Sequence, residues 1–138
     1  MSSANVELLR SIYTAWERGD FRSTTWAHPE IEFVLADGPD PGRWRGLSEV
    51  AEALRTMLDA WEGYRIQAEE FRELDGERVL VLTRNSGRGQ VSGLEIEQKR
   101  AQLHHIRRGK VTRWVYYHDR DRALADLGLA PEASSPAS

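Results

Sequence analysis

Two histidines and a tyrosine in the last quarter of the sequence have the types and spacing needed to move a proton. Side chains alternate along a β-strand, so Trp114, Tyr116 and His118 would share one face of an expected strand. On the strand before it, Gln102 and His104 share a face, and if that face points inward they could reach Tyr116. An imidazole changes charge near neutral pH, so His104 is the best candidate base. A phenol has an ordinary pKa of ~10 and suits hydrogen-bond donation to a carbonyl or a developing enolate. Tyr116 is therefore a candidate donor, with His118 as a second one.

Each of these residues also has a purely structural interpretation. Tyr116 would then be an aromatic of a pocket wall or of the core, and His104 a packing or surface side chain. His104 and His105 are adjacent, so they point to opposite faces and cannot comfortably bind one metal ion. Which of them faces inward depends on the strand register, which a single sequence specifies weakly. We predict no metal site.

Asp37 and Arg84 are two further candidates with charged side chains. Asp37 follows the first expected strand, and a carboxylate in an apolar cavity would have a raised pKa suited to acid–base work. The loop that contains it is also typical of a plain turn. Arg84 ends an expected buried strand. If it points inward it could bind a carboxylate or phosphate of a ligand, and if it points outward it is an ordinary surface charge.

Five tryptophans in 138 residues suggest a bulky core or an aromatic-lined cavity. Trp16 and Trp61 are expected on the apolar stripes of helices, and Trp26 and Trp44 near the mouth of a cavity. Such walls would accept a flat or polycyclic apolar ligand, unless the rings simply fill the space. The candidate ligand-binding residues are Tyr13, Trp16, Trp26, Trp44, Trp61, Arg84, Gln102, Trp114 and His118.

The elements that must position these residues are helices first and strands later. Apolar spacing predicts helices between residues 5 and 19, from 20 toward 26, from 47 to 61, and a short last helix between 119 and 128. Strands are expected over 31–35, 64–74, 78–85, 94–107 and 111–118, with a loop over 37–46. This order indicates an α+β fold. A strongly twisted antiparallel sheet wrapped around three N-terminal helices, followed by a short C-terminal helix, would form a cone with one open end.

Composition excludes several classes of function. The length suits a single domain over residues 1–130, with a disordered tail rich in Pro, Ala and Ser over 131–138. The chain has no cysteine and therefore no disulfide or thiolate nucleophile. A net charge of −3 argues against nucleic-acid binding by charge neutralisation. The first residues have neither the basic region nor the apolar run of a signal peptide, and the sequence has no run of ~18 apolar residues, so we expect a cytoplasmic protein that does not bind membranes.

Several local sequences resemble the SnoaL-like branch of the nuclear transport factor 2-like superfamily. They are Tyr13-Thr14-Ala15-Trp16-Glu17-Arg18-Gly19-Asp20, His28-Pro29-Glu30, Gly87-Arg88-Gly89, Ser92-Gly93, Gly109-Lys110-Val111, Tyr117-His118-Asp119-Arg120-Asp121-Arg122-Ala123-Leu124 and Leu127-Gly128-Leu129. The resemblance implies a cone-shaped α+β barrel that works without metal or cofactor. It also implies a homodimer that pairs through the outer sheet face, here the face of Val111, Val115 and Tyr117.

The chemistry implied by the resemblance is broad, because the superfamily includes cyclases, isomerases, epoxide hydrolases, dehydratases and binding modules. The catalytic aspartate of SnoaL-like cyclases corresponds approximately to Tyr116 here, so cyclase activity is not carried over. Ketosteroid isomerases carry their base close to the position of Asp37. The leading hypothesis is a cofactor-independent isomerase, cyclase or lyase that acts on an apolar carbonyl compound. The alternative is a non-catalytic module that binds a hydrophobic ligand or forms a dimer.

Overall fold

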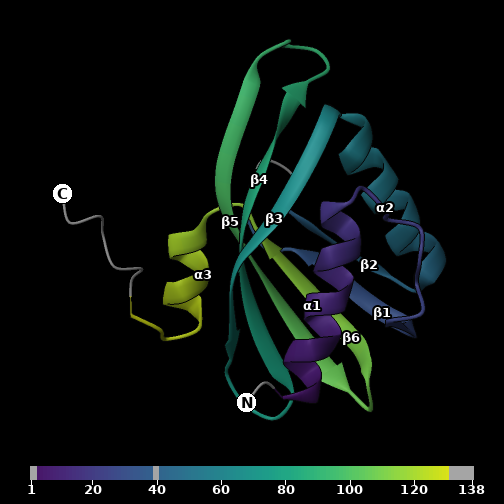
Figure 1. The fold of residues 1–138 in the computed structure, drawn as a ribbon, viewed down its shortest axis with the longest axis vertical. Coiled ribbons are helices and arrows are strands. Elements are labelled where there is room, and N and C mark those ends of the chain that lie inside the picture. Colours follow the sequence, from purple (N-terminus) through teal and green to yellow (C-terminus); the bar gives the residue numbers. More distant parts are fainter. Residues whose placement is uncertain (1–2, 39–40, 131–138) are drawn as a thin grey trace.

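Over the described residues, 3–38 and 41–130 of the computed structural model, the chain forms a mixed six-stranded sheet with two helices against one face and one against the other (Figure 1). The helices are α1 (Ala4–Glu17), α2 (Leu47–Asp59) and α3 (Arg120–Asp126). The strands are β1 (Ala27–Leu35), β2 (Gly42–Arg45), β3 (Trp61–Glu73), β4 (Arg78–Gly89), β5 (Glu95–Arg107) and β6 (Lys110–Tyr117). The strand order is β2-β1-β6-β5-β4-β3.

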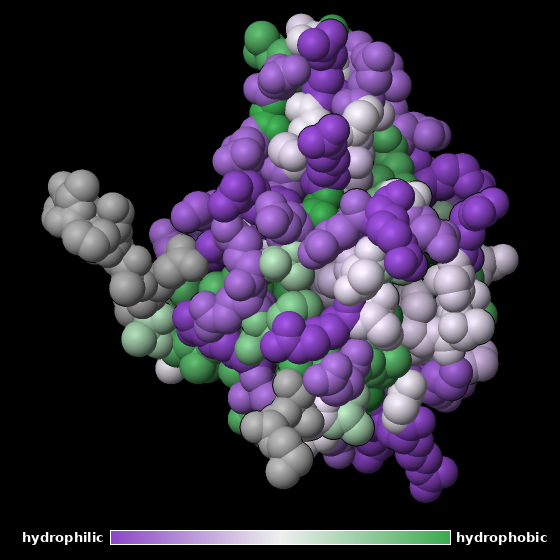
Figure 2. All heavy atoms as spheres, viewed as in Figure 1, coloured by the Kyte–Doolittle hydropathy of each residue, from purple (hydrophilic) through white to green (hydrophobic). Residues whose placement is uncertain are grey.

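The predicted α+β class is confirmed, and the arrangement is that of a cone-shaped α+β fold. The sheet differs from the prediction in one pairing: β1 and β6 are parallel, whereas the other neighbouring strands are antiparallel. No helix in the described ranges is long and apolar enough to span a membrane. The face seen in Figure 2 is mostly polar, with apolar side chains in scattered patches. The tail expected over residues 131–138 lies outside the described residues.

Helix α1 follows from a capped start and an apolar stripe. The hydroxyl of Ser3 accepts the backbone N–H of Val6 at 3.1 Å and so caps the helix. The buried side chains recur at three- and four-residue spacing and are Val6, Leu9, Ile12, Tyr13 and Trp16. This stripe turns Tyr13 and Trp16 toward the inner face of the sheet.

The predicted helix over residues 20–26 is wrong. Residues 20–24 have no regular structure, and 25–26 form a turn before β1. Local hydrogen bonds satisfy the segment instead: the Asp20 carboxylate accepts the N–H of Arg22 at 3.2 Å, and the Trp26 indole donates to the carbonyl of Ser23 at 2.8 Å. Short polar side chains that bond the nearby backbone compete with helix formation.

Two boundaries near α2 also differ from the prediction. The expected loop over residues 37–46 contains β2, an edge strand whose residues pair with the end of β1. Helix α2 ends at Asp59, so Trp61 is not on a helix stripe but is the first residue of β3. Trp61 is paired with Gly89 of β4, and the neighbouring Gly87 leaves room for the indole, since a Cβ there would lie 3.2 Å from the ring.

The two faces of the sheet have separate cores. Strand β6 turns Trp114 and Tyr116 inward with α1 and α2, and Val115 and Tyr117 outward beneath α3. Strand β4 is apolar and fully buried on both faces from residue 79 to 82, as predicted for an interior strand. The outer core is therefore already covered by α3 within one chain, and the cavity described below lies on the inner face.

Strands β5 and β6 bring the predicted proton-transfer residues to one region. The register pairs Gln102 with Tyr116 and His104 with Trp114. The turn between these strands uses Arg108 and Gly109, whose φ angles of 51° and 74° suit a tight hairpin. Gln102 and His104 both form hydrogen bonds with Tyr13 of α1, so this face points inward.

Candidate functional site

A cavity of about 430 Å³ lies between the inner face of the sheet, helix α2 and the segment before β1. Six of the predicted site residues line it: Trp16, Trp26, Trp61, Gln102, Trp114 and Tyr116. Apolar side chains of α2, among them Val50, Leu54 and Met57, form the opposite wall. The volume is within the range of small-molecule sites.

Three tryptophans form a packed aromatic wall. The rings of Trp16 and Trp114 stack with their centroids 5.2 Å apart and an interplanar angle of 26°. Trp26 meets both edge-on, at 5.7 Å from Trp16 and 6.0 Å from Trp114. Rings that pack against one another in this way are held rigid and present flat apolar surface to the cavity.

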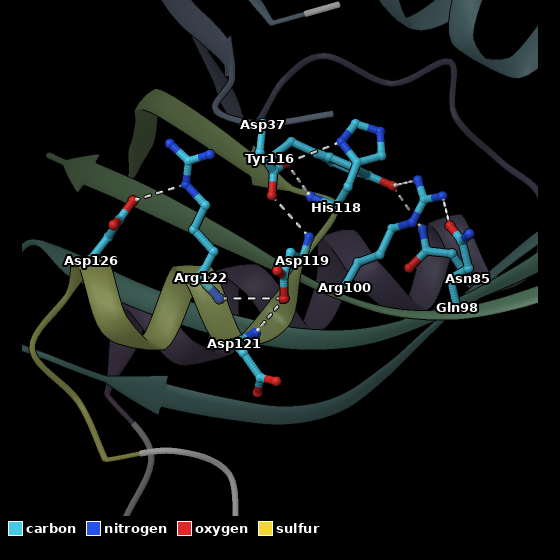
Figure 3. Close-up of polar contacts among 10 residues, drawn as sticks. All are labelled: Asp37, Asn85, Gln98, Arg100, Tyr116, His118, Asp119, Asp121, Arg122 and Asp126. Carbon is cyan, nitrogen blue, oxygen red and sulfur yellow. Dashed lines mark hydrogen bonds and ion pairs between the residues drawn. The ribbon is translucent and has the colours of Figure 1, made fainter. Parts of the chain in front are cut away.

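The polar end of the cavity is the hydroxyl of Tyr116. It accepts a hydrogen bond from Nη1 of Arg100 at 2.8 Å and one from Nδ2 of Asn85 at 3.2 Å, and Figure 3 shows Tyr116 beside the guanidinium. The same Asn85 amide donates to the hydroxyl of Tyr64, which also lines the cavity. Because Arg100 and Asn85 use the oxygen of Tyr116 as acceptor, its own O–H is left to donate, and a side-chain hydrogen bond also joins Tyr116 to Tyr64.

The two phenols of the cavity are neutral at ordinary pH. Burial raises the pKa of Tyr116, and the positive charge and hydrogen bond of Arg100 oppose that rise. Burial and the neighbouring Tyr116 raise the pKa of Tyr64 far above its usual range. Both side chains therefore act as hydrogen-bond donors rather than as bases.

A chain of hydrogen bonds behind the wall runs in one direction. An indole N–H can only donate, so the contact of 2.9 Å from Trp114 identifies the Gln102 atom as its amide oxygen. The amide nitrogen of Gln102 then faces Thr83 at 3.4 Å, and the Thr83 hydroxyl donates to Oδ1 of Asn85 at 2.8 Å. The amide nitrogen of Asn85 is left to donate to the two phenols. The chain thus points its donors at the polar end of the cavity.

His104 stands at the other end of this chain. The Tyr13 hydroxyl donates to Oε1 of Gln102 at 2.9 Å, so its oxygen accepts from Nε2 of His104 at 2.8 Å. Burial, with a smaller contribution from His105, lowers the pKa of His104 to about 3. Nδ1 of His104 is buried and has no hydrogen-bond partner among the described residues, which fits the neutral tautomer with its proton on Nε2. The ring stacks on Trp114 at 5.8 Å.

His104 and Tyr13 do not line the cavity as far as the described residues go. Trp114 and Gln102 lie between them and the open space, and His104 contacts Tyr13 rather than Tyr116. These contacts favour a positioning role for His104 over that of a base.

Asp37 and His118 lie at the end of β6, outside the cavity. The Asp37 carboxylate accepts the backbone N–H groups of His118 at 2.6 Å and Asp119 at 3.0 Å, and lies 3.2 Å from Nδ1 of His118 (Figure 3). Burial by itself would raise the pKa of Asp37, but these hydrogen bonds outweigh burial and lower it. The contacts join the end of β1 to the end of β6, as a structural turn residue would.

Arg84 and Trp44 also lie away from the cavity wall of the described chain. Arg84 forms an ion pair with Glu69 at 2.8 Å and points outward, as in the alternative interpretation. Trp44 is on the edge strand β2 and packs on Phe33, with ring centroids 5.8 Å apart. Neither side chain is placed to contact a ligand in the cavity.

The comparisons with known proteins identify the family. The model of the SnoaL-like domain matches residues 9–114 of the sequence. The chain belongs to the SnoaL-like domain family. No curated protein sequence matches it at a significant level.

Solved structures share the fold of this SnoaL-like chain over nearly its whole length. TerC co-crystallised with polyporic acid is 24% identical, with a TM-score of 0.73 over 92% of this chain and 98% of TerC. A nuclear transport factor 2-like protein of unknown function from Burkholderia pseudomallei is 22% identical, with a TM-score of 0.75 over 90% and 97%. A proposed polyketide cyclase from Xanthomonas campestris is 21% identical, with a TM-score of 0.69 over 90% and 96%. At these identities the likeness shows the fold alone.

The sequence interpretation missed Arg100, Asn85 and Tyr64, which build the polar end of the SnoaL-like cavity. A signal for Arg100 was present, because it alternates in step with Gln102 and His104 and so lies on the same strand face. Charged side chains are rarely buried without a reason, and Arg100 is only 6% exposed. Asn85 and Tyr64 could not be found in this way, since their contacts depend on how β3, β4 and β6 come together.

The described residues contain no group of three metal-ligating side chains close enough to hold a metal ion.

Proposed function

We propose that this SnoaL-like protein binds an apolar aromatic carbonyl compound in its cone and donates a hydrogen bond from Tyr116 to the carbonyl oxygen. The observation that carries the proposal is the Tyr116 hydroxyl at the polar end of a 430 Å³ cavity with tryptophan walls, held by Arg100 at 2.8 Å. The remainder of the lining is mostly apolar, so the body of the ligand would lie against the rings. Membership of the SnoaL-like family, and the likeness to TerC with its small ligand, support a protein that handles small molecules.

The same arrangement supports a cofactor-independent isomerase, cyclase or lyase. Negative charge that develops on the carbonyl oxygen of a reacting ligand would be stabilised by the Tyr116 hydroxyl, with Arg100 and Asn85 as its supports. Donors that are already oriented need no rearrangement when the charge forms. Among the described residues that line the cavity, the only carboxylate is Asp59 at the end of α2, and its side chain is exposed.

The alternative is a non-catalytic binding module. The specific observation in its favour is that the described lining holds no buried carboxylate or imidazole that could take a proton. Asp37 and His104 hold their hydrogen bonds elsewhere. Binding without turnover is the expected result for this alternative.

A titration with 2-acetylnaphthalene tests the proposal. We expect saturable binding by calorimetry in the unaltered protein, and weaker binding in Ala51→Phe, which adds a ring to the α2 side of the cavity. Ala125→Phe is the matched control, because this exposed alanine lies on α3 across the sheet. Polyporic acid is a second probe, taken from the TerC structure. No binding of either compound, or equal binding by both variants and the unaltered protein, would contradict the cavity as the site. Chromatography of the mixtures then separates an enzyme from a binding module.

The proposal keeps the cytoplasmic location and the homodimer as expectations. The outer face named for the dimer cannot serve it directly, because Val115 and Tyr117 are each 6% exposed beneath α3, and Val111 belongs to the inner core. Sedimentation velocity at micromolar concentration measures the assembly, and a monomer there would remove the dimer from the proposal.

A further inference from the structure

Arg100 is a buried cation for which the described chain supplies no counter-ion. It is 6% exposed and lines the cavity. Nη1 donates to the Tyr116 hydroxyl and Nη2 to Oε1 of Gln98, and both acceptors are neutral. Nε is buried without a hydrogen-bond partner, and no carboxylate of the described residues forms an ion pair with the group. The guanidinium has more N–H groups than these two acceptors use.

Burying a guanidinium among neutral acceptors alone is unfavourable. A charge taken out of water without a partner of opposite sign loses more hydration energy than neutral acceptors return. Carboxylates are available nearby but are used on the other face of the sheet, where Glu69 pairs with Arg84 and Arg120 at 2.8 Å each. The Nε of Arg120 also donates to the backbone carbonyl of Arg100 at 3.2 Å, so the strand is held at this residue.

The rest of the cavity lining also has more cations than carboxylates. Two more arginines, Arg22 and Arg55, line it and are exposed, against one carboxylate, Asp59. Lining cations outnumber lining carboxylates in the described chain, and the wall between them is aromatic. A ligand that matches this lining has a flat apolar body and a negatively charged group that reaches Arg100.

We infer that the cavity binds an aromatic organic acid in its anionic form, with the anionic oxygen held by the guanidinium of Arg100 and the hydroxyl of Tyr116. The inference rests on the proposed function, since it names the ligand class of the same cavity. Hydrogen bonds from a guanidinium and a phenol to one oxyanion are charge-assisted and stronger than those to a neutral carbonyl. The anion also supplies the counter-ion that Arg100 lacks. An acid should therefore bind more tightly than a neutral molecule of the same shape.

Two ligands of nearly equal shape test the inference. Calorimetric titrations at neutral pH compare 2-naphthoate with 2-naphthamide. We expect 2-naphthoate to bind at least about tenfold more tightly, because charge-assisted hydrogen bonds are about twice as strong as neutral ones. A second pair, 2-hydroxy-1,4-naphthoquinone as its anion and the corresponding methyl ether, distinguishes an enolate from a carboxylate. Preference for the acid in either pair supports the inference, and preference in neither pair overturns it.

Variants locate the preference within the cavity. In Arg100→Gln the preference should disappear while 2-naphthamide still binds. Arg107→Gln is the matched control, because Arg107 ends the same strand and pairs with Glu77 outside the cavity. If the preference persists in Arg100→Gln, or is lost only in Arg22→Gln or Arg55→Gln, then Arg100 is not the anion site and the inference is overturned.

The binding results distinguish a failure of this inference from a failure of the proposed function. Neutral ligands that bind as tightly as acids would leave the proposed function intact and overturn the inference alone. No binding of acids or neutral compounds would remove both. Should Arg100→Gln fail to fold, the comparison of the two ligand pairs in the unaltered protein still decides.

Discussion

Arg100 and Arg120 are buried arginines on opposite faces of the sheet, and Arg120 donates a hydrogen bond to the backbone carbonyl of Arg100. The two guanidinium groups differ in the side chains around them. On the outer face, Arg120 is 5% exposed, pairs with Glu69 at 2.8 Å and donates to the carbonyl of Thr83 at 2.7 Å. On the inner face, Arg100 is 6% exposed and meets the neutral acceptors Tyr116 and Gln98. The first cation has its carboxylate from the chain, whereas the second lines a cavity.

This difference indicates that the outer face maintains the fold, whereas the inner face can bind a ligand. The outer face is a closed core in which α3 covers the sheet and the charges are paired, so its residues maintain the fold. The inner face contains polar groups that the fold alone does not need: a chain of donors directed at Tyr116, and Arg100, which has no carboxylate partner among the described residues. Buried polar groups that go beyond the requirements of packing are where a ligand is expected.

The largest expected effect compares the two arginines directly. Arg120→Met removes a buried charge from Glu69 and leaves two carbonyl groups without their donor, so we expect a loss of about 3 kcal/mol in the free energy of unfolding. Arg100→Met replaces an unpaired buried charge with an apolar side chain, and the change should stay within about 1 kcal/mol. Urea denaturation measures both, and equal losses would contradict the distinction between the faces.

As the pH falls, the stability that His104 contributes on the inner face should be lost before the stability that Glu69 contributes on the outer face. The folded-state pKa of His104, about 3, lies below the ordinary value of 6.5, so the unfolded chain binds the proton more readily. The stability that His104 contributes is fully present above pH ~6.5 and is lost as the pH falls toward 3, at up to ~1.4 kcal/mol per pH unit. We expect a loss of about 2 kcal/mol between pH 7 and pH 5.

The His104→Gln variant should lose most of this dependence on pH, whereas the control His28→Gln should keep it. On the outer face, hydrogen bonds from Arg120 lower the pKa of Glu69 despite burial, so the stability from that carboxylate is lost only below its ordinary pKa of 4.5. Denaturation at a series of pH values tests the order. A flat profile between pH 7 and pH 5 would show that His104 is not held neutral by the fold.

Two adjacent tyrosines offer the next comparison. Tyr116→Phe removes the donor at the polar end of the cavity and should weaken binding of 2-acetylnaphthalene about tenfold, the value of roughly one hydrogen bond. Tyr117→Phe is the matched control on the outer face, where the hydroxyl donates to Asp126 at 3.2 Å. Calorimetry measures both affinities, and an equal effect of the two variants would contradict the assignment of the site to the inner face.

The smallest expected effect concerns Arg84, the more exposed partner of Glu69. Its ion pair of 2.8 Å is partly exposed, so water and salt screen the charges. Arg84→Met should therefore shift the urea midpoint far less than Arg120→Met, although both variants remove a contact to the same carboxylate. A shift as large as that of Arg120→Met would show that the outer ion pairs act as one unit.

Much of the fold was predictable because periodic apolar residues determine which face of an element is buried. The stripe of α1, the interior strand β4 and the alternation along β6 from Trp114 to Tyr117 follow from local spacing. Val111 was expected on the outer face but lies in the inner core, because the register of β5 and β6 shifts near their hairpin. The segment from residue 20 to 26 and the end of α2 were mispredicted, because local hydrogen bonds and strand pairing outweighed the helical pattern. The parallel pairing of β1 with β6 joins segments far apart in the chain, and no local pattern encodes it.

The sequence by itself determined the residue types of the site: the tryptophans, the strand face that Gln102 and His104 share, and the phenol of Tyr116 on the next strand. Only the tertiary structure decided which of them meet. It placed His104 against Tyr13, moved Asp37 and His118 to the end of the sheet, and brought Arg100 to Tyr116. The physical reason is that alternation gives a side chain its face, whereas register and strand order give it its neighbours.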